Sequence, residues 1–554
     1  MALERDKRSP ACAGAFTPPV FVENRGCFFV EFCCIIVKCS ILFMLSLLIQ
    51  RTTTMLFNSY SFLCFFPIVT IIFFVIPRKA RYIWLLAASY YFYMSVNAKY
   101  ALLLAVSTLT TYLGALAIDS AVFAHSGKYA RFRKPVFVLC IVVNLGILIF
   151  YKYFGFLLGN VNKLLTAIGA NAIGGGFSIV LPVGISFYTF QVLGYLIDVL
   201  RGNVRAERNI LRYALFVSFF PQLISGPIGR AGSLMPQIEN CENIKVWDRE
   251  RICSGLIIAL WGYFQKLVIA DRASIFVNEI FSAYSTFGSV ELLLGAMLYT
   301  VQIYCDFSGY SLIALGTAKV IGFDLTENFN APYFAASIKE FWRRWHISLS
   351  TWFRDYLYFP LGGSRCSKAR KYFNLMVTFL VSGLWHGASW SFVVWGAVHG
   401  AYQIIGDLLR PVKERVRTRL NVNTGCFSYR LGQVLITDLL VCIAWIFFKM
   451  GSFTDALRYI LRIVTRPNPW VLHNGSLFVH GLDQRQFAIL LFAMVLLLIF
   501  DALRYAKGLR IDEFLAGQNL WFRWVVIYFI LFAVVIYGVY GPTYDASAFI
   551  YFQF

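Results

Sequence analysis

Charged residues are scarce in this chain, at 14% of its 554 positions, and acidic residues are the scarcer kind, with 28 Asp and Glu against 50 Lys and Arg. Soluble globular domains carry about 25% charged residues, so the composition excludes that class. In their place 59% of the residues are hydrophobic and 18% aromatic. Many apolar runs are about 20 residues long, which suits a ~30 Å hydrocarbon core. The chain is therefore predicted to be an all-α polytopic integral membrane protein.

Several familiar functional motifs are missing as well. No G-x-S-x-G, Walker A, H-E-x-x-H or Rossmann pattern lies in a suitable context. The 13 cysteines include no pair with metal-ligand spacing, so we expect no metal site. The net charge of +22 does not indicate nucleic acid, because the basic residues cluster in short loops between apolar runs. Such loops face anionic membrane lipids on the cytoplasmic side.

These basic loops predict the topology. The apolar runs 60–76, 100–123 and 177–200 are each followed by a basic loop, whereas the runs between them return to the other side. The positive-inside rule then puts Met55 outside, and counting runs gives about 11–13 membrane segments. The segment 213–230 contains Pro221 and Gly226-Pro227, so we expect a broken or re-entrant element there.

Residues 1–54 differ from the rest. Their apolar stretch, 28–49, is interrupted by Glu31 and Lys38, which is unlike the uninterrupted apolar region of a signal peptide. We expect an N-terminal extension that is either an extra helix or the product of a misassigned start, with translation beginning at Met55. Residues 55–554 are expected to form the membrane domain.

Three of the six histidines, His346, His386 and His399, lie in the stretch 338–399. His386 is flanked by two apolar arms, 373–384 and 388–405, with basic residues beyond both. Both ends of this hairpin are therefore expected in the cytoplasm, with His386 carried deep into the membrane. An ionisable side chain there marks a functional site by default, and a neutral imidazole could act as a general base. Gly387 would let a substrate approach the backbone closely.

His346 follows a cluster of tryptophans and arginines that includes Trp345, Arg343 and Arg344. Such a cluster suits the cytoplasmic interface, where arginines could bind the phosphates of an entering cofactor. The alternatives are an interfacial anchor for this cluster, a simple contact between helices for His386, and a helix partner for Asp306. We interpret His399 as structural. On these grounds alone, an acyltransferase and a transporter remain equally open.

Long ordered motifs carry a resemblance over residues 55–554. They read MLFNSYSFLCFFP (55–67), SYYFYM (89–94), LPVGISFYTFQ (181–191), FFPQLISGPIGR (219–230), IYCDFSGYS (303–311), ENFNAPYF (327–334), FWRRWHISLSTWFRDYLYFPLGG (341–363) and GLWHGASW (383–390). With them the chain resembles the membrane-bound O-acyltransferase (MBOAT) family, in its bacterial branch of the alginate O-acetylation membrane subunit. Leu312 departs from the pattern, since family members commonly have an aspartate after the serine, and they typically begin near the M-L-F-N-S motif.

The resemblance implies a ring of helices, with short re-entrant or broken ones, around a thinned centre and a central funnel. It implies that His386 and His346 are the catalytic pair. The expected donor- or substrate-binding residues are Trp345, Arg343, Arg344, Trp385, Gly387, Asp306 and Ser308. No cofactor is expected to stay bound, and acetyl-CoA or another acyl thioester would be the co-substrate.

The expected function is acyl transfer across the bacterial inner membrane, from a cytoplasmic thioester toward O-acetylation of a cell-surface polysaccharide. The expected partners are a periplasmic or extracellular acetyl-accepting protein of the SGNH type, the polysaccharide and the membrane lipids. Two alternatives stay open. One is D-alanyl transfer from a carrier protein for teichoic acid modification, and the other is a transporter or flippase without covalent chemistry.

Overall fold

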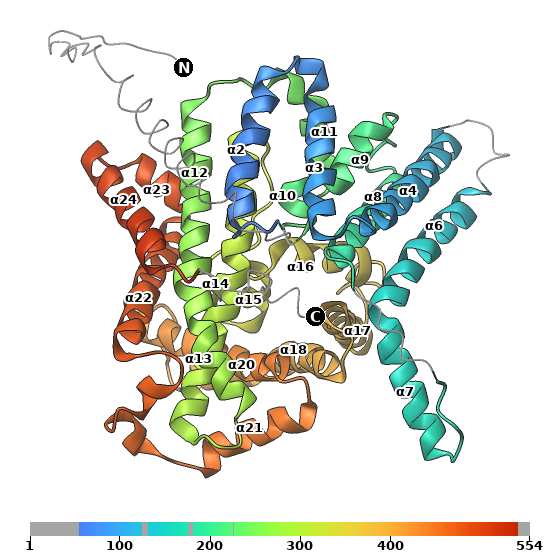
Figure 1. Ribbon diagram of the computed structural model, residues 1–554. Coiled ribbons are helices and arrows are strands. Elements are labelled where there is room, and N and C mark those ends of the chain that lie inside the picture. The colour runs from blue at the N-terminus through green and yellow to red at the C-terminus, as the bar shows by residue number, and fades with distance from the viewer. Residues whose placement is uncertain (1–54, 124–130, 175–180, 225, 541–554) are drawn as a thin grey trace, which may run out of the picture. The chain divides into compact units, whose positions relative to one another are not determined.

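The computed structural model describes residues 55–123, 131–174, 181–224 and 226–540, and all regular structure within these ranges is helical (Figure 1). The all-α prediction is thereby confirmed. Residues 1–54, for which an extension was expected, lie outside the described residues.

The first helices form the N-terminal part of the membrane domain. Their bounds are α2 Tyr60–Val75, α3 Arg81–Asn97, α4 Tyr100–Phe123, α6 Arg133–Leu148 and α7 Phe154–Ala167. Ser59 starts α2, because its side chain accepts a hydrogen bond from the Phe62 amide. A π-helical turn, Ile149–Tyr153, joins α6 to α7, so that the apolar stretch Arg133–Ala167 is 35 residues long. Such a turn places a side chain out of the regular helical register.

The next segments are short and closely packed: α8 Ile185–Arg201, α9 Ile210–Ser218, α10 Phe220–Leu223 and α11 Ala231–Glu239. The helical path breaks at Phe219 between α9 and α10, and both flanking helices are buried. Non-helical backbone at membrane depth is tolerated where it is enclosed by protein. The predicted broken element at 213–230 is therefore found.

Two long elements run side by side through the middle of the domain: α12 Arg249–Tyr263, continued by a π-helical turn Phe264–Ala270 and α13 Asp271–Ser282, against α14 Ser289–Ile321 (Figure 1). A buried ion cluster holds them together. The Lys266 ammonium donates to Asp271 at 2.7 Å and to Asp306 on α14 at 2.6 Å. Two carboxylates around one ammonium compensate the cost of burying charge.

The histidine stretch forms α15 Ile338–Arg344, α16 Ile347–Phe353, a π-helical turn Arg354–Tyr358, α17 Lys368–His386, α18 Trp390–Leu408 and α19 Arg410–Arg419. Helices α17 and α18 pack closely along their length, which is the expected hairpin with His386 at its tip. The remaining helices are α20 Phe427–Lys449, α21 Phe453–Thr465, α22 Gln484–Lys507, α23 Ile511–Ala516 and α24 Leu520–Tyr537.

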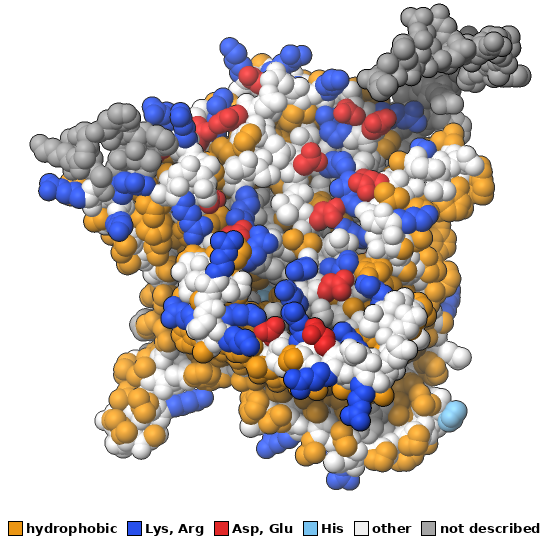
Figure 2. Space-filling view, turned by 180° about the vertical axis from the view of Figure 1, so that it is seen from behind, with side chains coloured by type: hydrophobic (Ala, Val, Ile, Leu, Met, Phe, Trp, Pro, Cys, Tyr) orange, Lys and Arg blue, Asp and Glu red, His pale blue; other side chains and the backbone are white. Residues whose placement is uncertain are grey.

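Within the described ranges, seven helical stretches are long and apolar enough to cross a membrane, and eight if the bent pair α18–α19 counts as one span. The prediction of 11–13 segments treats every apolar run as a crossing. Several of those runs form helices of only 16 or 17 residues, such as α2, α3 and α8. The protein is multi-pass, and Figure 2 shows Lys and Arg side chains gathered across the middle of one face, bordered by hydrophobic ones.

Candidate functional site

The C-terminus of α17 ends inside the protein, and side chains from the α6–α7 junction satisfy its last carbonyls. Lys152 Nζ donates to the carbonyl oxygens of Trp385 at 2.6 Å and of His386 at 3.1 Å. The Tyr153 hydroxyl donates to the Leu384 carbonyl at 2.8 Å. Carbonyls at a helix end lack intrahelical partners and carry partial negative charge. These two side chains therefore cap the helix end at the tip of the hairpin.

His386, the last residue of α17, is 4% exposed and enclosed by aromatic rings. The ring centroids of Trp385 and Trp395 each lie 5.0 Å from that of His386, and the Phe448 ring lies at 5.3 Å. These rings come from α17, α18 and α20, which meet at the hairpin tip. A side chain held by three rings keeps one orientation, as a reacting group requires.

His346 lies between α15 and α16 in a left-handed backbone conformation, with φ 42° and ψ 56°, and it is fully buried. A non-glycine residue in this region is strained, and persists only where its surroundings fix it. Asn328 does so: its backbone carbonyl accepts from the Ile347 amide at 2.9 Å, and its Oδ1 accepts from the Ser348 hydroxyl at 2.6 Å. Asn328 Nδ2 in turn donates to Ser311 on α14 at 3.1 Å. Strain of this kind is common at functional sites.

Trp385 brings the two predicted histidines together. Its ring lies 5.0 Å from the His386 ring and 6.0 Å from the His346 ring, measured between centroids. Phe307 of α14 covers the other side of His346 at 4.6 Å. The structure therefore gathers His346, Trp385 and His386 into one buried cluster, although 40 positions separate the histidines in the sequence.

A small cavity that is partly open to solvent lies beside this cluster. It is lined by Lys152, Leu181, Pro182, Val183, Gly184, Ile185, Ser186, Phe187, Ile224, Trp385 and His386. Lys152 donates a third hydrogen bond, at 3.2 Å, to the Ser186 hydroxyl. These lining residues include one lysine and no carboxylate, so the only charge that they can place at the cavity next to His386 is positive.

The Trp/Arg cluster is separate from this cavity. Trp345 is 2% exposed and packs among rings such as Trp445, at 5.0 Å. Arg344 pairs with Glu340 at 3.0 Å, and Arg343 is exposed. None of the three lines the cavity at His386. The structure therefore separates this cluster from the cavity at His386, because His346 points inward whereas Arg343 is at the surface, and a role of the cluster in donor binding stays a prediction.

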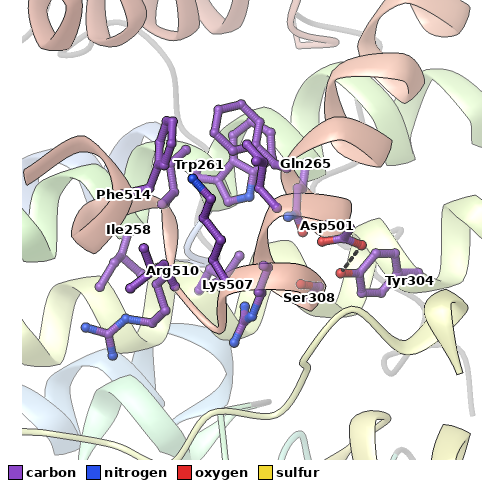
Figure 3. Close-up of a pocket in the computed structure, with 15 residues that line it drawn as sticks. Ile258, Trp261, Gln265, Tyr304, Ser308, Asp501, Lys507, Arg510 and Phe514 are labelled. Carbon is purple, nitrogen blue, oxygen red and sulfur yellow. Dashed lines mark hydrogen bonds between the residues drawn. The ribbon is translucent and has the colours of Figure 1, made fainter. Parts of the chain in front are cut away.

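Two further predicted residues also lie elsewhere. Asp306 is engaged by Lys266, as the helix-partner alternative proposed. Ser308 lines a different pocket, shown in Figure 3, where the Tyr304 hydroxyl donates to Asp501 at 2.9 Å. Phe307, between them in sequence, packs its ring against His346.

Gly387 is needed for packing. A Cβ on it would lie 2.2 Å from the ring of Phe392 on α18, closer than any real contact. The Phe392 ring fills the side on which a Cβ would project, and a close approach of a substrate to the Gly387 backbone stays a prediction. His399 is structural as interpreted: it is fully buried and its Nδ1 accepts from Trp342 at 3.2 Å.

Lys152, Ser186 and Asn328 are the polar residues of this site that sequence reasoning missed. Lys152 offered a signal, because it is a lone charge between two tyrosines in an apolar run of 35 residues. Ser186 and Asn328 lie inside the motifs LPVGISFYTFQ and ENFNAPYF, but nothing in their local pattern points to the histidines. Within the described residues, no group of three His, Cys, Asp or Glu side chains could hold a metal ion.

A second hollow, which we call the Arg230 groove, lies outside the spanning helices. It is lined by Asp198, Arg201, Asn203, Arg230, Asp355, Tyr356, Phe359 and Pro360. Burial raises the pKa of Asp355, but hydrogen bonds from Arg354 and Arg230, at 2.7 and 2.8 Å, outweigh it and hold that pKa below its ordinary value. From Tyr356, contacting rings of Trp352 and Phe190 lead inward to Trp385.

Comparison with known proteins supports the resemblance. Residues 203–446 match the model of the membrane-bound O-acyltransferase family. The chain is 36% identical to a probable alginate O-acetylase AlgI of Azotobacter vinelandii, over 80% of this chain and 85% of that protein. It is 33% identical to a peptidoglycan O-acetyltransferase of Helicobacter pylori (75% and 81%) and 30% identical to a teichoic acid D-alanyltransferase of Streptococcus thermophilus (48% and 72%). The likeness to the alginate O-acetylation branch is confirmed. This multi-pass protein belongs to the membrane-bound O-acyltransferase family.

Proposed function

We propose that this acyltransferase takes an acetyl group from a cytoplasmic thioester, acetyl-CoA, and passes it across the membrane for O-acetylation of a cell-surface polysaccharide. The observation that carries the proposal is the cluster of two buried histidines around Trp385, at the tip of a membrane hairpin and beside a cavity. At 1.5 Å per residue, the 19 residues of α17 reach about 28 Å from its basic start, almost the thickness of the hydrocarbon core.

His386 acts as the general base in this scheme. Its imidazole takes the proton of an acceptor hydroxyl while that oxygen forms a bond to the thioester carbonyl carbon. The tetrahedral intermediate then breaks its carbon–sulfur bond, and the departing thiolate takes the proton back from His386. His346, on the other side of Trp385, hydrogen-bonds the thioester group and holds it in line. The products are an acetyl ester and a free thiol.

The donor enters through the Arg230 groove. Arg230 and Arg201 line it and could bind the phosphates of CoA, and a row of contacting rings connects Tyr356 in this groove to Trp385 beside the histidines. This assignment replaces Arg343 and Arg344, which lie away from the cavity. Phosphate contacts at the mouth would fix the far end of the donor and leave its thioester to the histidines.

The charge of the cavity favours acetyl over D-alanyl. A D-alanyl group carries an ammonium, and the cavity beside His386 already has Lys152 and no carboxylate among its lining residues. Placing a second cation there is unfavourable at the low dielectric of the membrane interior. Weaker similarity to the D-alanyltransferases, over 48% of this chain, is in keeping with this choice.

The remaining components follow from the direction of transfer. The protein would lie in the bacterial inner membrane and hand the acetyl group to a periplasmic partner of the SGNH type, which acetylates the polysaccharide. A transporter would instead move a substrate without forming an ester and would not need His386.

Inside-out membrane vesicles test the proposal, because they expose the cytoplasmic face to the medium. With radiolabelled acetyl-CoA outside and an acceptor polysaccharide with its partner protein inside, we expect alkali-labile label in the lumen for the wild type and none for His386→Ala. Label that enters the lumen but stays unesterified would contradict the proposal and favour transport. Transfer from a D-alanyl carrier protein with none from acetyl-CoA would favour the D-alanyl alternative.

A further inference from the structure

The cavity beside His386 is also lined by two polar side chains, Lys152 and Ser186, that have no role in the general-base scheme. Lys152 comes from the α6–α7 junction and Ser186 from the first turn of α8, and both line the cavity together with His386. Lys152 Nζ lies 3.2 Å from Ser186 Oγ. Three separate elements thus place a lysine, a serine and a histidine around one space.

The surroundings of Lys152 suit an ammonium, the form in which we propose that it acts. Its Nζ lies within hydrogen-bond distance of three oxygens, those of Trp385, His386 and Ser186, and an ammonium has the three hydrogens that these contacts need. Within the described part of the chain, no carboxylate pairs with it. The negative end of the α17 dipole offsets part of its charge, and the rest remains directed at the cavity.

Ser186 can carry the effect of this charge to a substrate through a polarised hydrogen bond. Its hydroxyl oxygen accepts from Lys152, and among the described residues its hydrogen has no acceptor. The side chain is 8% exposed, and the space it borders is the cavity. A hydroxyl whose oxygen is bound to an ammonium is a stronger donor, because the bonds polarise one another.

We propose that Ser186 and Lys152 form the oxyanion site of the acyl transfer, a role that rests on the proposed function. When the acceptor oxygen bonds to the thioester carbonyl carbon, the carbonyl electron pair moves to its oxygen. The Ser186 hydroxyl donates to that oxyanion, and the Lys152 ammonium behind it supplies the compensating charge. When the carbon–sulfur bond breaks, the pair returns to form the ester carbonyl, and both side chains keep their protons. Groups fixed in advance toward a developing charge need no reorganisation during the reaction.

The same side chain also caps α17, so the test must separate the two roles of Lys152. Tyr153 offers the matched control, because it caps the same helix end through Leu384 but does not line the cavity. Lys163 on α7 is an exposed lysine that serves as a second control. Ser186→Ala removes the hydroxyl and leaves the cap intact.

The experiment measures the transfer of label from acetyl-CoA in inside-out vesicles for Ser186→Ala, Lys152→Met, Tyr153→Phe and Lys163→Met, with folded protein quantified after detergent extraction. We expect Ser186→Ala to lower kcat by about 100-fold at unchanged KM for acetyl-CoA, as the loss of one oxyanion donor does. Lys152→Met should lose at least as much, Tyr153→Phe should lose much less, and Lys163→Met should match the wild type.

Wild-type kcat in Ser186→Ala would overturn this inference while leaving the proposed function in place. Equal losses in Tyr153→Phe and Lys152→Met would reduce Lys152 to a helix cap and also overturn it. If Lys152→Met does not fold, Ser186→Ala decides alone. The absence of transfer by the wild type would instead refute the proposed function itself.

Discussion

The packing of the hairpin makes Gly383 a sensitive position for catalysis. Helices α17 and α18 meet there backbone to backbone: a Cβ on Gly383 would lie 2.2 Å from the Phe392 carbonyl oxygen and 3.2 Å from the Gly396 nitrogen. Carbon and oxygen atoms approach each other to about 3.3 Å at closest. The substitution Gly383→Ala therefore increases the distance between the two helices by about 1 Å.

That separation reaches the proposed base directly, because His386 is three residues further along the same helix. A displacement of about 1 Å costs on the order of 100-fold in rate when it misplaces a reacting group. Overpacking of this kind also costs about 1–3 kcal/mol of stability. Gly383→Ala should therefore lower kcat by about 100-fold while the protein still folds.

Gly406 provides the control, since it lies on α18 and a Cβ there would meet nothing within 4 Å. The assay is acetyl transfer in inside-out vesicles, together with the melting temperature of the purified protein in detergent. Gly406→Ala should match the wild type in both measurements. A Gly383→Ala protein with wild-type kcat would refute the reasoning, because it would mean that the helix contact does not set the position of His386.

Three further predictions concern the surroundings of the site. Asn328→Ala removes the side-chain hydrogen bonds to Ser348 and Ser311 that support the turn at His346, and it should lower kcat by about 10-fold or more. Asn328→Asp, which keeps the oxygen acceptor, should lose less, and steady-state transfer rates of the two variants decide this. Lys266→Met leaves the buried carboxylates of Asp271 and Asp306 without their cation and should destabilise the protein by about 3–5 kcal/mol. The melting temperature should fall strongly, and a melting temperature equal to that of the wild type would contradict this prediction. The pKa of Asp355 is lowered in the folded protein, so its contribution to stability is present above the ordinary carboxyl pKa of about 4 and is lost as the pH falls below it. Melting temperatures measured from pH 7 to pH 3 should show this loss. Asp355→Asn should abolish this part of the pH dependence.

The hairpin and its histidine were predictable from the sequence because their signals are local. Basic residues flank two short apolar arms, and a histidine lies between these arms as an ionisable residue in an otherwise apolar stretch. The structure places His386 at the tip of this hairpin, as expected. The segment 213–230 was equally readable, since proline and glycine interrupt an apolar run there.

The cavity wall could not be predicted, because it depends on which segments meet in space. Lys152 and His386 are 234 positions apart, and their contact depends on where the α6–α7 junction packs. The directions in which the side chains of the Trp/Arg cluster point could not be predicted from the sequence either. A left-handed turn at His346 sends this residue inward, while Arg343 remains at the surface.

The most direct test of the account is the O-acetyl content of the surface polysaccharide in a deletion strain that carries wild-type protein, His386→Ala or His346→Ala, with each variant quantified by immunoblot. The account predicts that the wild type restores acetylation and that His386→Ala, present at the same level in the membrane, does not, with a loss for His346→Ala as well. Normal acetylation by His386→Ala would contradict the account, because acyl transfer would then proceed without the proposed base.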